Sequence, residues 1–232
     1  MKIEEFIIEV EKLGIDLTEE QLKKLEHFYE LLISWNEKMN LTRITEKEEV
    51  YLKHFYDSLT LTKVVDLKDV ETLCDVGSGA GFPGIVLKIV FPNLKITLID
   101  SLQKRVNYLN AISKELELKD IVAIHTRCED YAKINREKFD IVTARAVANL
   151  KMLSELCIPM VKVNGYFIAM KANVEDEIKE SKNILNELSS KIEEVNEFNL
   201  PKEESKRTLI KIKKIKETNK KYPRTIDKIK KS

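Results

Sequence analysis

Four glycines fall within eight residues of this chain, directly after an apolar run, and they constrain its fold more than any other feature. The segment reads Asp75-Val76-Gly77-Ser78-Gly79-Ala80-Gly81-Phe82-Pro83-Gly84. Glycine allows a sharp turn and a close approach to a ligand that a Cβ atom would exclude. Asp100 ends the next apolar run, where an acidic side chain can bind ribose hydroxyl groups. Together these features predict a site for a nucleotide-type cofactor.

The segments around this site alternate from residue 70 onward between short β-rich runs and amphipathic stretches. This alternation predicts an α/β fold with a parallel sheet covered on both faces, and with ligands at the carboxyl ends of the strands. A loop as short as 201–205 cannot hold a crossover helix, so the final strand should run antiparallel to its neighbour. We expect strands at 71–76, 95–99, 121–125, 139–144, 165–170, 191–198 and 207–213, and helices at 83–90, 102–116, 150–161 and 174–188.

Residues 1–64 have a helical pattern throughout. Thr18 and Gln21 have the spacing of a capping box, and apolar residues then recur at helical intervals up to Trp35. We expect these aromatic and apolar side chains to pack as core against the main sheet. The sequence thus predicts a helical lobe at 1–64, a main domain at 65–216 and a basic tail at 217–232.

Composition and charge limit the classes of function. The 232 residues include no apolar run of membrane length, and the first residues lack the apolar centre of a signal peptide, so we expect a cytoplasmic protein with no membrane partner. The spacing of the three cysteines suits neither a zinc site nor a disulfide framework, and no metal is expected. Residues 206–232 hold twelve Lys or Arg and two acidic residues, which indicates either a polyanionic partner or a solvated tail.

Three features favour S-adenosylmethionine over a dinucleotide, although Gly79 to Gly84 fits G-x-G-x-x-G. Pro83 removes a backbone N–H that a pyrophosphate would use at a helix start. Asp75 would repel a pyrophosphate but could accept a charge-assisted hydrogen bond from an ammonium group. A closing antiparallel strand resembles the class I methyltransferase sheet more than a dehydrogenase sheet. NAD-linked oxidoreduction remains the alternative.

Within this interpretation, the ends of the next two strands supply the nucleoside contacts. Asp100 should bind the ribose, and Ser101 should cap the helix that follows. Cys128 and Glu129 follow the third strand, where a backbone N–H and an acidic side chain could meet the adenine edge. For Asp100 a helix-capping role, and for Glu129 an exposed loop position, are the structural alternatives.

The end of the fourth strand should present the acceptor. It lacks the Asn/Asp-Pro-Pro-aromatic sequence of exocyclic-amine methylation and a cysteine nucleophile for carbon methylation. An acceptor with a free lone pair, such as N7 of guanine, needs no base beforehand, so positioning should dominate catalysis. Arg145 could hold a phosphate or base edge, close over the cofactor, or form a structural ion pair.

Nearly the whole chain resembles the bacterial RsmG (GidB) family of 16S rRNA guanine-N7 methyltransferases. The matching segments are Met39-Asn40-Leu41-Thr42-Arg43, His54-Phe55-Tyr56-Asp57-Ser58-Leu59, the glycine run through Gly84, Asp100-Ser101-Leu102-Gln103-Lys104-Arg105, Cys128-Glu129 and Thr143-Ala144-Arg145-Ala146. The resemblance implies a class I S-adenosylmethionine-dependent methyltransferase fold, Rossmann-like, with a seven-stranded sheet, an antiparallel last strand and the N-terminal helical lobe.

The resemblance also implies function and site residues. We expect methyl transfer from S-adenosylmethionine to one guanosine of 16S rRNA, free or in an assembling small ribosomal subunit, by a monomer. His54, Arg145 and Lys171 are the expected catalytic residues, although Lys171 precedes Ala172 where the family commonly has glycine. The basic C-terminal residues should contact RNA phosphates. A non-catalytic RNA-binding module on the same scaffold is a third possibility. The expected cofactor contacts are Asp75, Gly77, Gly79, Phe82, Asp100, Ser101, Leu102, Cys128, Glu129 and Arg145.

Overall fold

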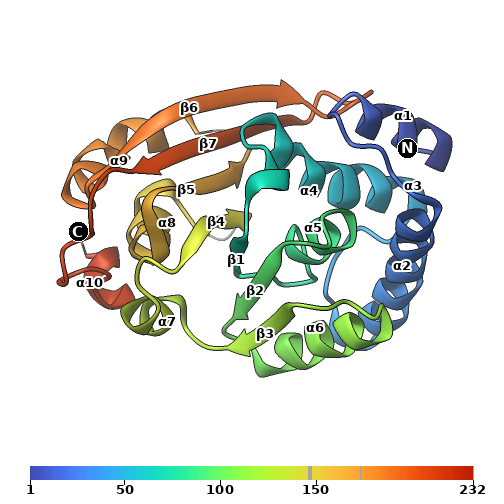
Figure 1. Ribbon diagram of the computed structural model, residues 1–232, viewed down its shortest axis with the longest axis horizontal. Helices are drawn as coiled ribbons and strands as arrows, with labels where there is room; N and C mark the ends of the chain where they lie inside the picture. Colours follow the sequence, from blue (N-terminus) through green and yellow to red (C-terminus); the bar gives the residue numbers. More distant parts are fainter. Residues whose placement is uncertain (146–147, 173, 232) are drawn as a thin grey trace.

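A single mixed sheet forms the centre of the molecule in the computed structural model, which describes residues 1–145, 148–172 and 174–231. Within these residues, seven strands lie in the order β3-β2-β1-β4-β5-β7-β6 (Figure 1). Their bounds are β1 Thr72–Val76, β2 Lys95–Asp100, β3 Ile121–His125, β4 Phe139–Arg145, β5 Val161–Lys171, β6 Ser190–Asn199 and β7 Lys206–Lys214.

The strand directions follow from the connections between them. Strands β1 to β5 pair in parallel, with β1 between β2 and β4, while β7 runs antiparallel to both β5 and β6. The antiparallel final strand expected from the short 201–205 loop is therefore confirmed. Because the strand order reverses between β1 and β4, a ligand crevice is expected outside their carboxyl ends.

Side-chain burial distinguishes the central strands from the edge strand. In β1 the four residues from Leu73 to Val76 are all buried, whereas buried or half-buried and exposed residues alternate along β6. A central strand covered on both faces requires a continuous apolar run, and an edge strand with one solvated face gives alternation.

Helices cover both faces of the sheet. One layer contains α5 and α6 together with the N-terminal helices, and the other contains α7, α8 and α9 (Figure 1). The helical bounds are α1 Ile3–Glu11, α2 Glu19–Met39, α3 Lys47–Val50, α4 Asp57–Leu59, α5 Gly84–Val90, α6 Gln103–Glu115, α7 Cys128–Ile134, α8 Leu150–Cys157, α9 Glu175–Glu187 and α10 Ile226–Lys230, and a π-helical segment, Tyr51–Tyr56, joins α3 to α4.

The N-terminal helices pack on the face of the molecule that carries α5 and α6. Thr18 and Gln21 form the expected capping box at the start of α2. Phe28 lies 5.4 Å from the ring of Phe82, and Trp35 contacts Tyr108 of α6 edge-on at 5.6 Å. These aromatics belong to the same hydrophobic core as the strand residues on that face, and α2 reaches this core through its contacts with α5 and α6.

Two helix boundaries differ from those expected from the sequence. Leu102 is the N-cap of α6, so the prediction that Ser101 caps this helix is wrong. Helix α8 ends at Cys157, and a short 3₁₀ turn through Pro159 leads into β5 four residues earlier than expected. Pro159 has no N–H to donate to the carbonyl four residues earlier, so the α-helical hydrogen-bond pattern stops and the chain continues as the 3₁₀ turn.

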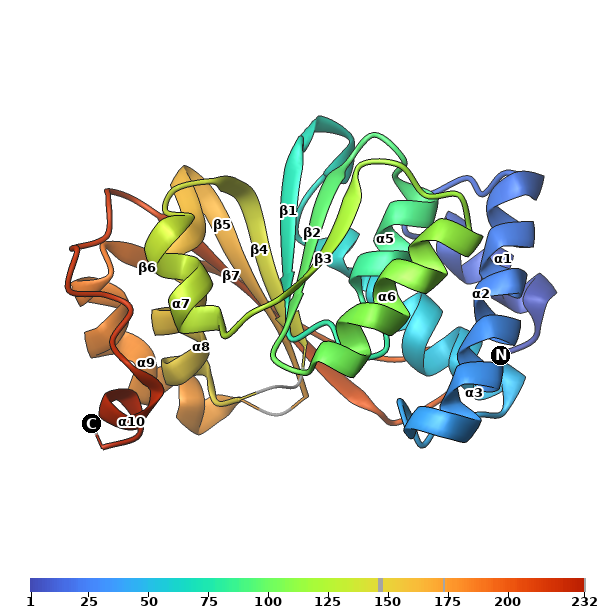
Figure 2. The same cartoon turned by 90° about the horizontal axis from the view of Figure 1, so that it is seen from below.

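The C-terminal residues return toward the sheet instead of extending from it. After β7 the chain runs beside α8 and α7 and ends in α10 (Figure 2). Tyr222 is 3% exposed and Ile229 is 5% exposed, and both belong to the core on that face. The described residues of the segment expected as a basic tail, 217–231, are thus packed onto the main domain.

Candidate functional site

Two cavities lined by described residues open near the carboxyl ends of the parallel strands. The first, here called the glycine-loop cavity, has a volume of about 480 Å³, and the second, the arginine cavity, has about 380 Å³. Both volumes are in the range of small-ligand sites. The glycine-loop cavity is lined by Val76, Gly77, Ile99, Asp100, Ser101, Leu102, Thr126, Arg127, Cys128, Glu129, Ala148, Met152, Leu153, Leu156 and Ile226. The arginine cavity is lined by Ile44, Lys53, His54, Asp57, Thr60, Arg145, Met170, Lys171, Ala172, Arg207, Thr208 and Leu209.

The glycine loop is held against the end of β2. Gly77 and Gly79 have φ values of 70° and 55°, a region that favours glycine. The Gly77 N–H donates to the carbonyl of Ile99 at 2.8 Å, and the Gly79 N–H donates to Asp100 Oδ2 at 3.0 Å. Gly77 lines the glycine-loop cavity, whereas Gly79 acts on its shape through Asp100.

Asp75, which we predicted to bind the ammonium group of the cofactor, lines neither cavity. Its carboxyl group is completely buried, its Oδ2 accepts the Gly84 N–H at 2.9 Å, and its Oδ1 has no hydrogen-bond partner among the described residues. Burial raises the pKa of Asp75 to about 6. Because Asp75 lines neither cavity, this geometry does not support a direct contact with a cofactor ammonium group; instead Asp75 fixes the start of α5.

The start of α5 offers few groups to a pyrophosphate. Pro83, the residue before α5, has no N–H, the Gly84 N–H is bound to Asp75, and the Ile85 N–H donates to the Gly81 carbonyl at 2.8 Å. A phosphate-binding helix terminus needs free N–H groups directed at the ligand. The local geometry therefore disfavours a dinucleotide.

Asp100 combines a structural contact with a cavity position. Its Oδ1 accepts the Leu102 N–H at 2.9 Å, its Oδ2 accepts the Gly79 N–H, and Arg105 lies 3.6 Å from Oδ2. A carboxylate has about four lone-pair sites, so Asp100 retains acceptors for ribose hydroxyl groups. The neighbouring Leu102 is 42% exposed and lines the cavity, which provides an apolar surface for a ligand face.

Glu129 contributes an unsatisfied acceptor. It is 5% exposed and lines the glycine-loop cavity, and its Oε2 is buried without a hydrogen-bond partner among the described residues. A buried carboxylate oxygen is costly unless a donor reaches it. Cys128 is the first residue of α7, where N–H groups have no intrahelical acceptor. The unpaired Oε2 of Glu129, the Asp100 carboxylate at the end of β2 and the apolar side chain of Leu102 together fit an adenosine-type cofactor.

A buried carboxylate organises the arginine cavity. Asp57 is 4% exposed; its Oδ2 lies 3.1 Å from Arg145 Nη1 and its Oδ1 lies 2.9 Å from Arg207 Nε. We expected no role for Asp57 from the sequence, although it lies in the His54–Leu59 segment that carries the resemblance, and Arg207 was included only among the basic residues of 206–232. Lys53 and Lys171 also line this cavity and pair with the acidic side chains of Glu49, Glu203 and Glu177 around it, so four cationic side chains line the cavity beside the single lining carboxylate of Asp57.

His54 is neutral, and both of its ring nitrogens are hydrogen-bonded. Its Nδ1 accepts from Arg145 Nη2 at 3.2 Å, which leaves the proton on Nε2 to donate to Thr42 Oγ1 at 2.9 Å. Burial and the nearby Arg145 charge lower the pKa of His54 to about 3. Since both ring nitrogens are used, this geometry suits His54 to positioning Arg145 rather than to proton transfer.

Phe82 lies behind this group and lines neither cavity. It is 3% exposed, stacks on the His54 ring at 4.4 Å and lies 5.3 Å from the Arg145 guanidinium carbon. We predicted that Phe82 contacts the cofactor, but its side chain does not line the glycine-loop cavity. Its ring packs against His54 and Arg145 instead. Arg145 lines the arginine cavity and not the glycine-loop cavity.

A hydrogen bond between Lys171 and Ala148 links the linings of the two cavities. Lys171 Nζ, at the arginine cavity, donates to the carbonyl of Ala148 at 2.6 Å, and Ala148 lines the glycine-loop cavity. Lys171 also pairs with Glu177 at 2.7 Å. Ala146, part of the sequence motif, lies outside the described residues. Arg145 at one cavity and Ala148 at the other thus mark the border across which two bound ligands would face each other.

The described part of the chain holds no cluster of three or more His, Cys, Asp or Glu residues that could bind a metal ion. In the same residues, no helix combines the length and the apolar character needed to cross a membrane.

Comparisons with known proteins agree with this geometry. The family model described as GidB, rRNA small subunit methyltransferase G, matches residues 21–210. A protein named Ribosomal RNA small subunit methyltransferase G from Bacillus licheniformis is 52% identical over 227 residues, which cover 97% of this chain and 95% of that protein. The protein of the same name from Bacillus cytotoxicus is 53% identical with the same coverage.

Solved structures show the same fold at low identity. An S-adenosylmethionine-dependent methyltransferase from Aquifex aeolicus matches with a TM-score of 0.55 and 20% identity, covering 75% of this chain and 96% of its own. TYW2 from M. jannaschii, solved in complex with AdoMet, matches with a TM-score of 0.51 and 16% identity, covering 64% and 71%. The expected class I methyltransferase fold is confirmed.

Proposed function

Because this chain belongs to the rRNA small subunit methyltransferase G family, we propose that it transfers a methyl group from S-adenosylmethionine to N7 of a guanosine in 16S rRNA. The observation that carries this proposal is the pair of neighbouring cavities linked by the hydrogen bond from Lys171 to Ala148, one suited to an adenosine-type cofactor and one lined by four cationic side chains. We further propose that the protein acts as a monomer in the cytoplasm.

The glycine-loop cavity holds the cofactor in this proposal. Gly77 allows close approach at the end of β1, Asp100 accepts from the ribose hydroxyls, and the buried Oε2 of Glu129 accepts from the exocyclic amine of adenine. The amine would remove the cost of that orphaned oxygen. When bound, S-adenosylmethionine supplies an electrophilic methyl group on a sulfonium centre.

The arginine cavity receives the target nucleotide. Lys53, Arg145, Lys171 and Arg207 provide positive charge that attracts RNA phosphates, and Asp57 fixes two of these side chains. The guanine must leave its stacked position in an RNA loop to enter.

The geometry favours an acceptor that needs no general base. Both nitrogens of His54 are hydrogen-bonded, and the Lys171 ammonium pairs with Glu177 and the Ala148 carbonyl. N7 of guanine carries a free lone pair, so in-line positioning suffices. In this proposal Arg145 holds the base, His54 positions Arg145, and Lys171 holds the Ala148 carbonyl in place.

The test is methyl transfer from radiolabelled S-adenosylmethionine to small-subunit rRNA, mapped by chain cleavage specific for N7-methylguanine. We expect one labelled guanosine, and comparison of deproteinised 16S rRNA with assembling subunits identifies the substrate. Label at another base atom, or none on either substrate, would overturn the proposal. Light scattering during the assay measures the oligomeric state.

Two alternatives give different binding results. A non-catalytic RNA-binding module would bind rRNA without binding S-adenosylmethionine, and an NAD-linked oxidoreductase would bind NADH. Calorimetric titration of the full-length protein with each ligand separates them. We expect no NADH binding, because the N–H groups of Gly84 and Ile85 at the start of α5 already donate hydrogen bonds within the protein.

A further inference from the structure

The residues after β7 form a continuous strap against the face of the molecule that carries α7 and α8. This strap, residues 215–231, is buried at Tyr222 and Ile229 and ends in α10 (Figure 2). It lies beyond residues 21–210, the region matched by the family model. The match to the family model therefore assigns no role to the strap.

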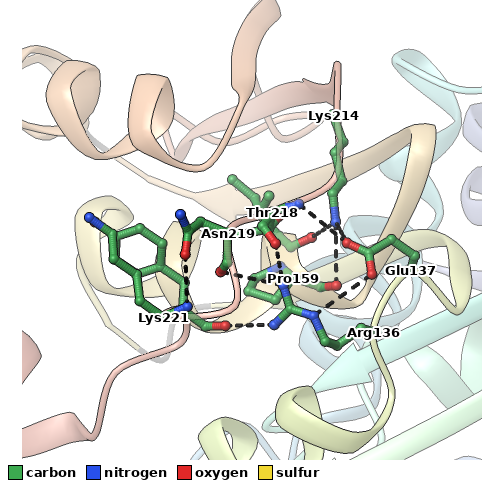
Figure 3. A network of polar contacts seen from close by, with 9 residues as sticks. Arg136, Glu137, Pro159, Lys214, Thr218, Asn219 and Lys221 are labelled. Carbon is green, nitrogen blue, oxygen red and sulfur yellow. Dashed lines mark hydrogen bonds and ion pairs between the residues drawn. The ribbon is translucent and has the colours of Figure 1, made fainter.

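Arg136 and Glu137, between α7 and β4, hold the first part of the strap. The Arg136 guanidinium donates to the backbone carbonyls of Tyr222 at 2.6 Å and Thr218 at 2.5 Å (Figure 3). Glu137 accepts from the Thr218 N–H at 3.3 Å and from Lys214 Nζ at 2.7 Å. A charged donor satisfying several carbonyls fixes the path of the backbone as well as its position.

Glu155 of α8 holds the second part. It is 1% exposed and accepts from the Arg224 N–H at 2.8 Å, from Nε at 2.8 Å and from Nη2 at 2.7 Å. The bidentate geometry gives this contact a defined direction. Residues 225 and 226, which follow at once, are thereby placed beside α8.

Ile226, the first residue of α10, reaches the glycine-loop cavity. It lines this cavity together with Met152, Leu153 and Leu156 of α8. The half-buried state of Ile226 leaves part of its side chain free to contact a ligand. The strap therefore extends the apolar wall that α8 provides.

We propose that the C-terminal strap is the outer wall of the cofactor site and that Ile226 packs on the adenine ring of the bound cofactor. The inference rests on the proposed function, because it takes S-adenosylmethionine as the occupant. An apolar wall fits the face of a base, whereas the methionyl part carries charges and the ribose carries hydroxyls. Arg136 and Glu155 are positioning residues that act through the strap.

The direct test compares Ile226→Ala with Ile215→Ala, a change in the same strap at a side chain that is 39% exposed and lines neither the glycine-loop cavity nor the arginine cavity. Calorimetry with the full-length protein measures binding of S-adenosylmethionine and of adenosine. We expect Ile226→Ala to weaken both by roughly three- to tenfold, because alanine covers less of the adenine ring, and Ile215→Ala to weaken neither. Thermal melting checks that the variants remain folded.

Adenosine distinguishes the adenine end from the methionyl end. If Ile226→Ala weakens S-adenosylmethionine but leaves adenosine unchanged, Ile226 does not face adenine and the assignment is overturned. Ile226→Trp should fill the cavity and abolish binding of both ligands. Unchanged affinity in both Ile226 variants would also overturn the inference, whereas failure of the parent protein to bind S-adenosylmethionine would overturn the proposed function itself.

The strap's attachment gives an independent readout. Arg136→Ala removes the hydrogen bonds to the backbone carbonyls of Tyr222, Thr218 and Asn219, none of which lines the glycine-loop cavity or the arginine cavity. We expect weaker adenosine binding and faster proteolysis within residues 215–231, with adenosine protecting the parent chain. Faster proteolysis with unchanged adenosine affinity would contradict a role of the strap in the cofactor site.

Discussion

The Oδ2 atom of Asp57 lies 3.1 Å from Nη1 of Arg145, so a carboxylate of the helical lobe fixes the guanidinium at the end of β4. Asp57 also binds Arg207 at the start of β7. One buried acid thus connects the lobe to two strands of the sheet. This connection links the stability of the lobe to the shape of the arginine cavity.

Asp57→Asn should lower both stability and RNA methylation. The change leaves Arg145 and Arg207 without their counter-charge, and because both are partly exposed we expect a loss of about 2 to 3 kcal/mol in the free energy of unfolding. Urea denaturation measures this loss. Affinity for S-adenosylmethionine should change little, since Asp57 does not line the glycine-loop cavity.

The exposed Asp16, which makes no ion pair in the described residues, supplies the control for this change. Asp16→Asn should leave stability and methylation unchanged. Equal stability of Asp57→Asn and the parent protein would show that the two arginines do not depend on this carboxylate.

Burial of neutral His54 should make the protein less stable in mild acid. Its pKa falls from an ordinary 6.5 to about 3 in the folded state, so between these values the unfolded chain binds the extra proton. Stability is therefore lost as the pH falls below about 6.5. Relative to His54→Gln, the parent protein should lose about 1.4 kcal/mol between pH 7.5 and pH 5.5.

When the free energy of unfolding of the parent is compared with that of His54→Gln at each pH, the contributions of the other titrating groups cancel. Asp75 acts in the opposite direction, because its raised pKa makes stability fall as the pH rises from 3.8 to about 6. Parallel profiles for the parent and His54→Gln would mean that His54 titrates normally.

Local patterns in the sequence predicted the sheet well. The length of a connection decides whether neighbouring strands can be parallel, so the short segment before β7 was sufficient to predict its direction. The alternation of side chains along a strand also contained a signal that the cofactor prediction did not use. Since Cys74 and Val76 lie in the core on the α7 and α8 side, Asp75 must point to the other face.

Contacts between distant segments were not predictable in the same way. Arg207 and Asp57 are 150 residues apart, and no local pattern relates them. In the C-terminal strap the charge run indicated a solvated or RNA-bound tail, but Tyr222 and Ile229 bury enough apolar surface to hold the segment on the core. Their spacing is too sparse to be recognised as a helix or strand.

Gly77→Val should abolish binding of S-adenosylmethionine while leaving the helical lobe folded. The valine side chain would enter the glycine-loop cavity at the end of β1, and a β-branched residue at φ 70° is strained. Gly14→Val is a matched control, since Gly14 has φ 79° and an added Cβ there meets no atom within 4 Å. Calorimetry should therefore detect binding to the Gly14 variant only, and retained binding to the Gly77 variant would place the cofactor elsewhere.

Glu129→Gln should change affinity and stability in opposite directions. Its buried Oε2 has no partner in the described residues, so removing the charge lowers the cost of burial and should raise the free energy of unfolding by about 1 kcal/mol. A glutamine is a weaker acceptor for the adenine amine, and affinity for S-adenosylmethionine should fall roughly tenfold. Asp130→Asn, next to it on the exposed side of α7, should change neither quantity. If Glu129→Gln weakened both stability and cofactor binding, Glu129 would be a structural residue whose oxygen is satisfied without the cofactor.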